Sequence, residues 1–153
     1  MPHLLCDVMS ANVHKISREK TLMDAAKLMQ QNDIGFLPVT DGQSVAGAVT
    51  DRDLVIRGYA RGLSPDTPVS DVMTKSCVHA DKSMPVCDAA KLMSEKQIRR
   101  LCVFDGDRLV GVCSLGDIST SQSGKEQAGD ALSRISLPAQ AAAGEQNFSP
   151  RGV

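Results

Sequence analysis

The sequence predicts a mixed α/β (α+β) fold of two β-α-β-β-α repeats that pack with pseudo-two-fold symmetry. Residues 7–54 align with residues 71–118 without a gap at an offset of 64, and 16 of the 48 aligned pairs are identical. Chance matching would give roughly three identities. The segment Asp-Ala-Ala-Lys-Leu-Met occurs at 24–29 and again at 88–93, with apolar residues at helical spacing. In both copies an Asp-Gly turn separates two apolar runs, which indicates a hairpin.

In the first repeat, a short strand is predicted at Val13–Ile16, followed by a helix. Thr21 is suited to cap this helix, because Asp24 three residues later completes a capping-box-like start. One helix face is apolar at spacings of three, four and seven residues, formed by Leu22, Ala25, Ala26 and Met29. Residues 34–40 and 45–49 flank the turn and are predicted to pair as strands.

A second helix is predicted at Arg52–Arg61, since a Thr-Asp pair precedes it and Gly62 can end it. The second repeat shows the same order of signals. The repeats are expected to cover residues 1–61 and 69–120, joined by a proline-containing loop at 62–68. One copy of about 50 residues would be marginally stable alone, so the two are expected to form a single domain.

The chain beyond the repeats is predicted to begin with a helix and to end in a tail. Residues 121–136 are expected to contain a C-terminal helix at Lys125–Ile135, with its apolar positions at helical spacing. Residues 137–153 contain Ala, Gly and Pro with a single aromatic residue, and we expect them to be disordered.

Composition argues against a partnership with nucleic acid or membrane. The net charge is −1, with 42% hydrophobic and 23% charged residues, so no global basic field attracts nucleic acid. No run of about 18 apolar residues is present to span a membrane. The N-terminus lacks the basic and apolar regions of a signal peptide, and the expected location is therefore the cytoplasm.

Five cysteines occur without a C-x-x-C pair, at Cys6, Cys77, Cys87, Cys102 and Cys113. Four of them lie in apolar surroundings in the second repeat, where a cysteine usually acts as a small core residue. We therefore expect reduced, structural cysteines. Cys6, near the terminus, is expected to be exposed and able to link two chains under oxidation.

A polar motif, Gly-x-x-Thr/Ser-x-x-Asp, closes both repeats. It occurs as Gly47-Ala-Val-Thr50-Asp-Arg-Asp53 and as Gly111-Val-Cys-Ser114-Leu-Gly-Asp117. The glycine permits close backbone approach, and the hydroxyl lies at a helix start, where phosphate binds favourably. The aspartate one turn later can accept hydrogen bonds from the vicinal hydroxyls of a ribose. The motif therefore suits a nucleoside phosphate.

A simpler interpretation of the motif stays open. Thr50 and Ser114 can serve only as helix caps, with Asp53 and Asp117 stabilising the helix starts. Finding the pattern twice does not decide between the two, because a duplication copies a cap as well as a binding site. No catalytic pattern accompanies the motif: the sequence has no nucleophile elbow, no metal-ligand spacing and no paired carboxylates. We therefore expect a protein that is not an enzyme and has no metal site.

The stretch from Cys6 to Thr120 resembles a tandem pair of CBS (cystathionine-β-synthase-type) domains, also called a Bateman module. It is similar to small bacterial CBS-pair proteins, some of them linked to stress or hypoxic responses. Besides the two Gly-x-x-Thr/Ser-x-x-Asp motifs, the matching features are Asp-Val-Met at 7–9 and 71–73, Ala-Ala-Lys-Leu-Met at 25–29 and 89–93, and Gly35-Phe-Leu-Pro-Val39 with its counterpart Arg99-Arg-Leu-Cys-Val103. The resemblance implies a homodimeric module that requires no cofactor and binds AMP, ADP, ATP, NAD or S-adenosylmethionine in the cleft between its repeats.

The resemblance also implies a set of ligand-binding residues. The ribose-binding aspartate falls on Asp53 and Asp117, and the hydroxyl residue near ribose or phosphate falls on Thr50 and Ser114. Basic residues that meet phosphates fall on Arg99 and Arg100. The adenine pocket is implied at Ile16, Leu37, Pro38 and Val39 in the first repeat, and at Ala80, Leu101, Cys102 and Val103 in the second.

The two sites implied in this way are unequal. Gly35-Phe36 stands where the second repeat has Arg99-Arg100, and Cys102 replaces the proline found as Pro38. Ala80 is smaller than its counterpart Ile16, which enlarges or loosens one pocket. We therefore expect one stronger site and one weaker or empty site.

Two functions remain open from the sequence. In the first, the chain is a non-enzymatic sensor whose ligand shifts the packing of the repeats or of two chains, and an effector protein detects the shift. In the second, it is a dimeric interaction scaffold or stress-response protein with empty or vestigial nucleotide sites. A change in thermal stability with an adenine nucleotide would discriminate between them.

Overall fold

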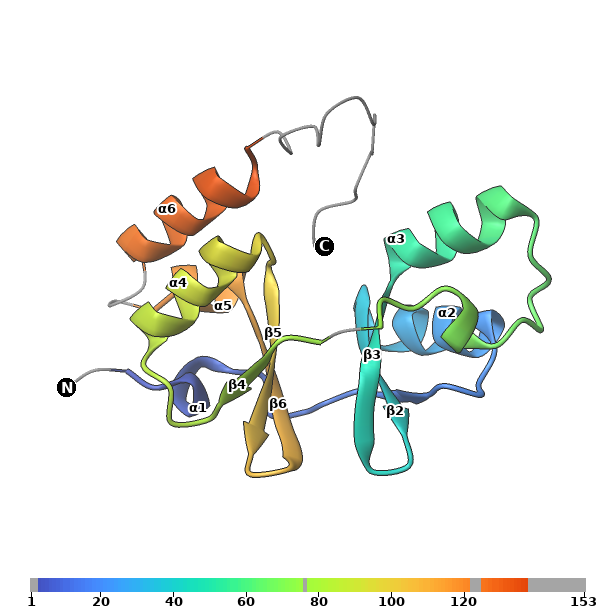
Figure 1. The fold of residues 1–153 in the computed structure, drawn as a ribbon, viewed down its shortest axis with the longest axis horizontal. Helices are drawn as coiled ribbons and strands as arrows, with labels where there is room; N and C mark the ends of the chain where they lie inside the picture. The colour runs from blue at the N-terminus through green and yellow to red at the C-terminus, as the bar shows by residue number, and fades with distance from the viewer. Residues whose placement is uncertain (1–2, 76, 122–124, 138–153) are drawn as a thin grey trace.

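The computed structural model describes residues 3–75, 77–121 and 125–137, and contains two three-stranded sheets. The first sheet has the order β1 (Ile16–Ser17), β2 (Phe36–Asp41), β3 (Ser44–Thr50); the second has the order β4 (His79–Asp81), β5 (Arg100–Asp105), β6 (Arg108–Ser114). In each sheet a short parallel strand precedes an antiparallel hairpin. The sheets lie next to each other at the centre, with the helices on their outer sides (Figure 1). The predicted fold class is confirmed.

The helices of the first repeat follow the local sequence signals. α2 (Leu22–Asn32) begins with a capping box, in which the Asp24 N–H donates to Thr21 Oγ1 and the Thr21 N–H donates to Asp24 Oδ2, each at 3.1 Å. The helix predicted at 52–61 forms as α3 (Asp51–Asp53), a π-helical segment η1 (Leu54–Gly58) and a 3₁₀ turn η2 (Tyr59–Arg61). Gly62 then ends it with a φ of 69°.

The strand expected at Val13–Ile16 is much shorter than predicted. Only Ile16–Ser17 pair with β2. The preceding residues cross from the second repeat to the first, and Ser10 forms an isolated bridge with Val112 of β6. Val13, the other apolar residue of the predicted strand, lines a cavity between the repeats, so its apolar character does not indicate a longer strand.

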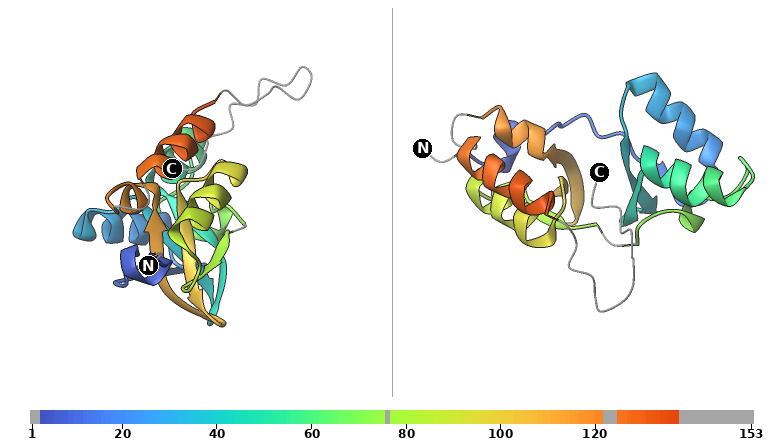
Figure 2. Two further views of the ribbon diagram at one scale, coloured as in Figure 1. Left: turned by 90° about the vertical axis from the view of Figure 1, so that its left-hand side faces the viewer. Right: turned by 90° about the horizontal axis from the view of Figure 1, so that it is seen from above.

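The second repeat carries one helix more than the first. Its helices are α4 (Val86–Lys96), α5 (Leu115–Ser119) and α6 (Lys125–Ile135), and α6 spans the range predicted for the C-terminal helix. Ala128, Ala131 and Ile135 of α6 are buried in the core of this repeat. In Figure 2, right, the helices of the two repeats lie at opposite ends of the molecule. The tail expected to be disordered lies, from residue 138, outside the described residues.

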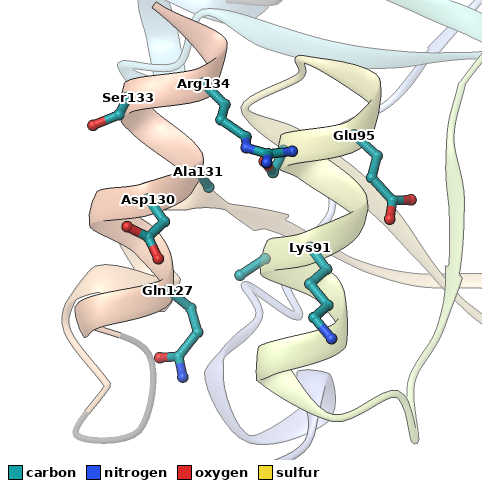
Figure 3. A pocket seen from close by; sticks show the side chains of 9 residues that line it. Lys91, Glu95, Gln127, Asp130, Ala131, Ser133 and Arg134 are labelled. Atoms are coloured by element: carbon teal, nitrogen blue, oxygen red, sulfur yellow. The ribbon is translucent and has the colours of Figure 1, made fainter.

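A polar groove separates the outer surfaces of α4 and α6. Lys91 and Glu95 of α4 and Asp130 and Arg134 of α6 line it, so it carries charges of both signs (Figure 3). Gln97, just after α4, donates a hydrogen bond to the Arg134 carbonyl at 3.1 Å, which ties the ends of the two helices together.

The two repeats exchange their first segments. Leu5 of α1 (Leu5–Val8) is buried in the core of the second repeat, and its N–H donates to the Met84 carbonyl at 2.9 Å. Conversely Val69 of η3 (Val69–Asp71) is buried in the core of the first repeat, followed by Val72. The boundaries 1–61 and 69–120 describe the sequence repeat, whereas each core takes its first segment from the other copy. This exchange is consistent with the single domain expected from the sequence, which stays a prediction.

The motif glycines lie where the chain crosses between repeats. Ala48 of β3 exchanges two backbone hydrogen bonds with Thr74, at 3.0 and 2.9 Å. A Cβ atom on Gly47 would overlap the Thr74 carbonyl oxygen and lie 3.1 Å from its carbon. The expectation that the glycine permits close backbone approach is therefore confirmed.

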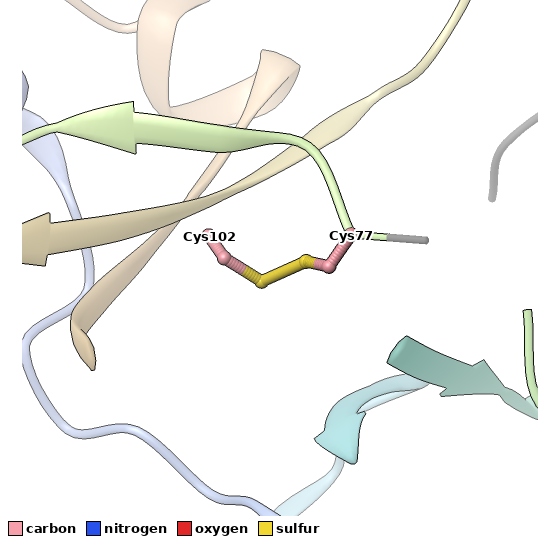
Figure 4. The surroundings of a disulfide bond; sticks show 2 residues. All are labelled: Cys77 and Cys102. Atoms are coloured by element: carbon pink, nitrogen blue, oxygen red, sulfur yellow. A yellow bond between two sulfur atoms is a disulfide. The ribbon is translucent and has the colours of Figure 1, made fainter. Parts of the chain in front are cut away.

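The expectation of reduced, structural cysteines is wrong for two of the five. Cys77 and Cys102 form a disulfide (Figure 4). Cys87 is exposed, whereas Cys113 is buried, and its burial raises the pKa of its thiol to about 12. Cys6 is exposed as predicted. Apolar surroundings alone did not indicate that Cys77 and Cys102 pair, because the pairing depends on how Cys77, which precedes β4, lies against β5.

Within the part of the chain that the structure describes, no helix combines the length and apolarity needed to cross a bilayer.

Candidate functional site

A cavity of about 320 Å³ lies between the two repeats. The first repeat contributes residues from the crossing segment 10–14 and from the turn 33–36. The second repeat contributes Arg100, Val112, Ser114 and Asp117. The cavity therefore exists only because the crossing segment of one copy lies against the motif of the other.

Ser114 and Asp117 form a capping box at the start of α5. The Asp117 N–H donates to Ser114 Oγ at 3.0 Å, and the Ser114 N–H donates to Asp117 Oδ2 at 2.8 Å. This is the helix-cap role that the sequence left open. The cap occupies one carboxylate oxygen, and Asp117 Oδ1 has no hydrogen-bond partner among the described residues. A cap and a ribose contact can therefore coexist on this side chain.

Thr50 and Asp53 form the same box at α3, in a more enclosed setting. The Thr50 N–H donates to Asp53 Oδ2 at 3.0 Å, and the Asp53 N–H donates to Thr50 Oγ1 at 3.1 Å. Asp53 is only 7% exposed, and its Oδ1 lies 3.7 Å from Nε of Arg57. Both carboxylate oxygens of Asp53 thus have protein partners, which distinguishes it from Asp117.

Arg100 and Phe36 occupy equivalent positions in the two repeats and contact each other. The guanidinium carbon of Arg100 lies 5.5 Å from the centroid of the Phe36 ring, a cation–π arrangement. Burial lowers the pKa of the Arg100 guanidinium, while Asp51 and Asp117 oppose that shift. The pair lies at the pseudo-two-fold axis, so the unequal residues noted in the sequence meet each other and do not belong to separate sites.

The residues implied for the adenine pocket divide by strand alternation. Ile16, Leu37 and Val39 pack in the core of the first repeat, and Ala80, Leu101 and Val103 pack in that of the second. Pro38 and Cys102 alternate with these residues and belong to neither core, so they face the other repeat. The assignment stays a prediction, and the six core residues would reach a ligand through their backbone.

The remaining site residues are unevenly placed. Ser114, Asp117 and Arg100 line the cavity, whereas Arg99 is exposed and its carbonyl accepts the Leu115 N–H at 2.8 Å. Thr50 and Asp53 are the sequence counterparts of Ser114 and Asp117 in the first repeat, and they are not among the described residues that line this cavity. We call Ser114, Asp117 and Arg100 the Asp117 half-site, and Thr50 with Asp53 the Asp53 half-site. Ligand binding at either half-site stays a prediction.

Sequence reasoning missed the cavity residues that come from the partner repeat, among them Asn12, His14, Asp33 and Phe36. Only one of these had a usable signal: Phe36 aligns with Arg100 at the offset of 64, and equivalent positions meet at a two-fold axis. Within the described residues, no group of three or more His, Cys, Asp or Glu side chains could hold a metal ion.

Comparison with known proteins shows the family of the chain. The family model of the CBS domain matches residues 5–58 and again residues 69–124. The chain belongs to the CBS domain family. CBS domain pairs are generally regulatory and ligand-binding.

Individual relatives support the same assignment. The CBS domain-containing protein YhcV of Bacillus subtilis is 41% identical over 130 residues, which are 85% of this chain and 93% of the relative. The crystal structure of Hypoxic Response Protein I with two coordinated zinc ions is 34% identical, with a TM-score of 0.68. The match covers 76% of this chain and 97% of that chain. The Mycobacterium tuberculosis protein called Hypoxic response protein 1 is 36% identical over 115 residues, which are 74% of this chain and 80% of that protein. The CBS domain pair of protein MJ0100, in complex with 5′-methylthioadenosine and S-adenosyl-L-methionine, is 27% identical, with a TM-score of 0.72, and covers 82% of this chain and 99% of its own.

Proposed function

We propose that this CBS pair is a non-enzymatic regulatory module that binds an adenosine-containing ligand between its repeats and signals to a partner protein by a conformational change. AMP, ADP and ATP are the leading ligands, and NAD and S-adenosylmethionine are the others. The observation that carries the proposal is the inter-repeat cavity, in which a carboxylate, a guanidinium and an aromatic ring converge from both copies.

The ribose and the phosphate of such a ligand each have a proposed counterpart in the cavity. Asp117 Oδ1 could accept hydrogen bonds from ribose hydroxyls, because the cap uses only Oδ2. Arg100 can contact phosphate, since a guanidinium donates in a fork that matches phosphate oxygens. A cavity of about 320 Å³ is at the small end of the range of ligand pockets. The neighbour MJ0100, solved with two adenosine derivatives, supports the ligand class.

The signal follows from the position of the cavity between the repeats. A ligand that contacts segment 10–14 of one repeat and Asp117 of the other favours the relative arrangement in which both contacts are made. The exchanged segments couple this arrangement to the cores, because α1 and η3 each pack on the opposite repeat. A partner protein that binds one arrangement would therefore detect the ligand.

The two half-sites are expected to fill in order. A ribose at Asp53 would displace the Arg57 contact, whereas a ribose at Asp117 would find one carboxylate oxygen unoccupied. We therefore propose the Asp117 half-site as the stronger one. If neither fills, the module is an interaction scaffold, an alternative favoured by the caps that already engage both aspartates.

The binding test compares the purified chain with two aspartate variants. The wild type is first titrated isothermally with AMP, ADP, ATP, NAD and S-adenosylmethionine. The same titrations are then done on Asp117→Asn, which retains a side-chain oxygen for the cap. We expect binding to weaken at least tenfold in Asp117→Asn and to change little in Asp107→Asn, an exposed hairpin residue. No heat and no thermal shift with any ligand at millimolar concentration would contradict the proposed function.

We also propose a homodimer formed through the helices of the first repeat. Val55, Ile56 and Tyr59 are 55%, 46% and 86% exposed, so α3–η2 presents an apolar surface to solvent. In the second repeat, α6 covers the corresponding helices. Size-exclusion chromatography with light scattering should show a dimer that Ile56→Asp dissociates; a monomeric wild type would contradict this part of the proposal.

A further inference from the structure

We propose that Cys77 and Cys102 form a reversible thiol–disulfide switch that controls ligand binding at the Asp53 half-site. The inference rests on the proposed function, because it assigns a regulation to the same cleft. Its oxidised state is the Cys77–Cys102 disulfide of the structure, and its reduced state is the dithiol.

The disulfide links Cys77 to Cys102 on β5, the central strand of the second sheet. Cys77 belongs to the segment by which the chain crosses from β3 of the first repeat to β4 of the second, which we call the second crossing segment. At one end of this segment, Thr74 bridges to Ala48 of β3. At the other end, His79 pairs with Cys102 of β5, whose N–H donates to the Val78 carbonyl at 3.2 Å. The described residues at the two ends of this segment therefore contact different repeats, and the disulfide holds Cys77 against β5 (Figure 4).

The pseudo-symmetry identifies what this segment does. Its counterpart is the crossing segment 10–14, in which Ser10 bridges to Val112 and whose residues line the cavity at Asp117. Val13 on that wall aligns with Cys77, and Pro38 aligns with Cys102. Cys77 thus occupies the wall position of the Asp53 half-site. The first repeat has Val and Pro at these two positions, so the Asp117 half-site has no equivalent cross-link.

The orientation of Cys102 places the disulfide on the ligand side of the sheet. Leu101 and Val103, its neighbours on β5, belong to the core beneath the helices, whereas Cys102 is excluded from that core and fully buried on the opposite face. Arg100, two residues away on that same face, contacts Phe36 of the first repeat. The two sulfur atoms consequently lie between the repeats, where a ligand of this half-site would bind.

The chemistry is thiol–disulfide exchange with a low-molecular-weight disulfide such as oxidised glutathione. The Cys77 thiolate, which is only half-buried, attacks that disulfide and releases one small thiol. The Cys102 thiolate then attacks the Cys77 sulfur of the mixed disulfide and releases the second small thiol. Two protein thiols are oxidised to one disulfide while one small disulfide is reduced to two thiols, and each thiol proton passes to a departing thiolate. Excess small thiol reverses both steps.

The switch acts by restraining the wall. With the disulfide intact, Cys77 is held on β5 and cannot turn away from the position that its counterpart Val13 has at the Asp117 half-site. After reduction, the contacts of the described residues around Cys77 are the Thr74 bridge, the Val78 hydrogen bond and the His79 pairing, so the Cys77 side chain can move away from β5. We therefore expect the reduced protein to bind more tightly at the Asp53 half-site, with no change at the Asp117 half-site.

The test titrates AMP into the full chain equilibrated with oxidised or with reduced glutathione. Alkylation before and after reduction, followed by peptide mass spectrometry, reports whether Cys77 and Cys102 are paired in each sample. To isolate the half-site, the titration is done in the Asp117→Asn background, where we expect at least fivefold tighter AMP binding after reduction. Cys77→Val, the residue of the first repeat at this position, should bind AMP with one affinity under both conditions, whereas Cys6→Ser should retain the difference.

The outcomes separate the switch from the proposed function. AMP binding that depends on Asp117 but not on glutathione leaves the proposed function intact and overturns the switch. Absence of the Cys77–Cys102 pair under oxidising conditions, or tighter binding by the oxidised chain, also overturns it. AMP binding in neither state overturns both. If Cys77→Val fails to fold, Cys102→Ala serves instead, because alanine keeps the N–H that bonds to Val78.

Discussion

Replacing Gly47 by alanine should destabilise the protein through a single backbone contact. A Cβ atom at this position would overlap the Thr74 carbonyl oxygen and lie 3.1 Å from its carbon and 3.3 Å from Lys75 Cα. Every one of these atoms is backbone, so no side chain can rotate away. The crossing segment must therefore move off β3, and Ala48 loses both of its hydrogen bonds to Thr74.

The magnitude follows from those two hydrogen bonds. At about 0.5–1.5 kcal/mol each, their loss costs about 1–3 kcal/mol. Alanine also lowers the conformational entropy of the unfolded chain, which by itself stabilises the folded state by about 0.4–1 kcal/mol. With the midpoints of these two ranges, about 2 and about 0.7 kcal/mol, the net destabilisation is about 1.3 kcal/mol, which for a domain of this length lowers the melting temperature by roughly 3–5 °C.

Urea unfolding followed by far-UV circular dichroism measures this change, since the chain has no tryptophan and its one tyrosine is exposed. Gly129→Ala is the matched control: nothing lies within 4 Å of its Cβ, and it lies in α6, so alanine should stabilise by about 0.5–1 kcal/mol. Gly111→Ala should cost less than Gly47→Ala, because its Cβ meets chiefly the flexible Met9 side chain. A Gly47→Ala variant as stable as the wild type would refute the reasoning.

Three further predictions concern the core, a buried thiol and a helix cap. Ile135→Ala should cost about 2–5 kcal/mol in urea unfolding, because Ile135 is 1% exposed in the core that α6 completes; a cost well below 1 kcal/mol would mean that α6 is not docked. Burial raises the pKa of the Cys113 thiol from 9.0 to about 12, so the folded state retains a proton that the unfolded state loses, and stability should fall as the pH rises above about 9. Cys113→Val should lose this part of the pH dependence; identical profiles for variant and wild type would contradict it. Hydrogen bonds from Thr21 lower the pKa of Asp24 below 3.8, so its stabilisation is present above that pH and is lost below it. The gap in melting temperature between Asp24→Asn and the wild type should therefore shrink at pH 2–3, and a gap that does not depend on pH would argue against the charged cap.

Local sequence patterns predicted the elements where the determining interactions are themselves local. The start of α2 follows from Thr21 and Asp24, three residues apart, and α6 follows from its apolar spacing. The first strand was predicted too long because Val13 is apolar for a different reason: it lines the inter-repeat cavity. Periodicity reports that a side chain is buried but not which surface buries it.

Only the motif side of the candidate site could be predicted from the sequence. The motif identified Ser114 and Asp117, because a capping residue and its aspartate are close in sequence. The wall at Asn12 and His14 comes from more than 90 residues away in the chain, and no local pattern links it to Asp117. Phe36 and Arg100 were noted as unequal counterparts, yet only the packed structure places them in contact.

By itself, the sequence determined that this protein is a duplicated α+β module, with a cap at each motif and a glycine where backbones approach. These features occur in both repeats, and each depends on residues within one turn or one hairpin. The tertiary structure alone decided that α1 and η3 exchange between the cores, that the cavity is shared, and that Cys77 pairs with Cys102. The physical reason is that a duplicated sequence encodes two similar surfaces, whereas the contacts across them depend on how those surfaces pack.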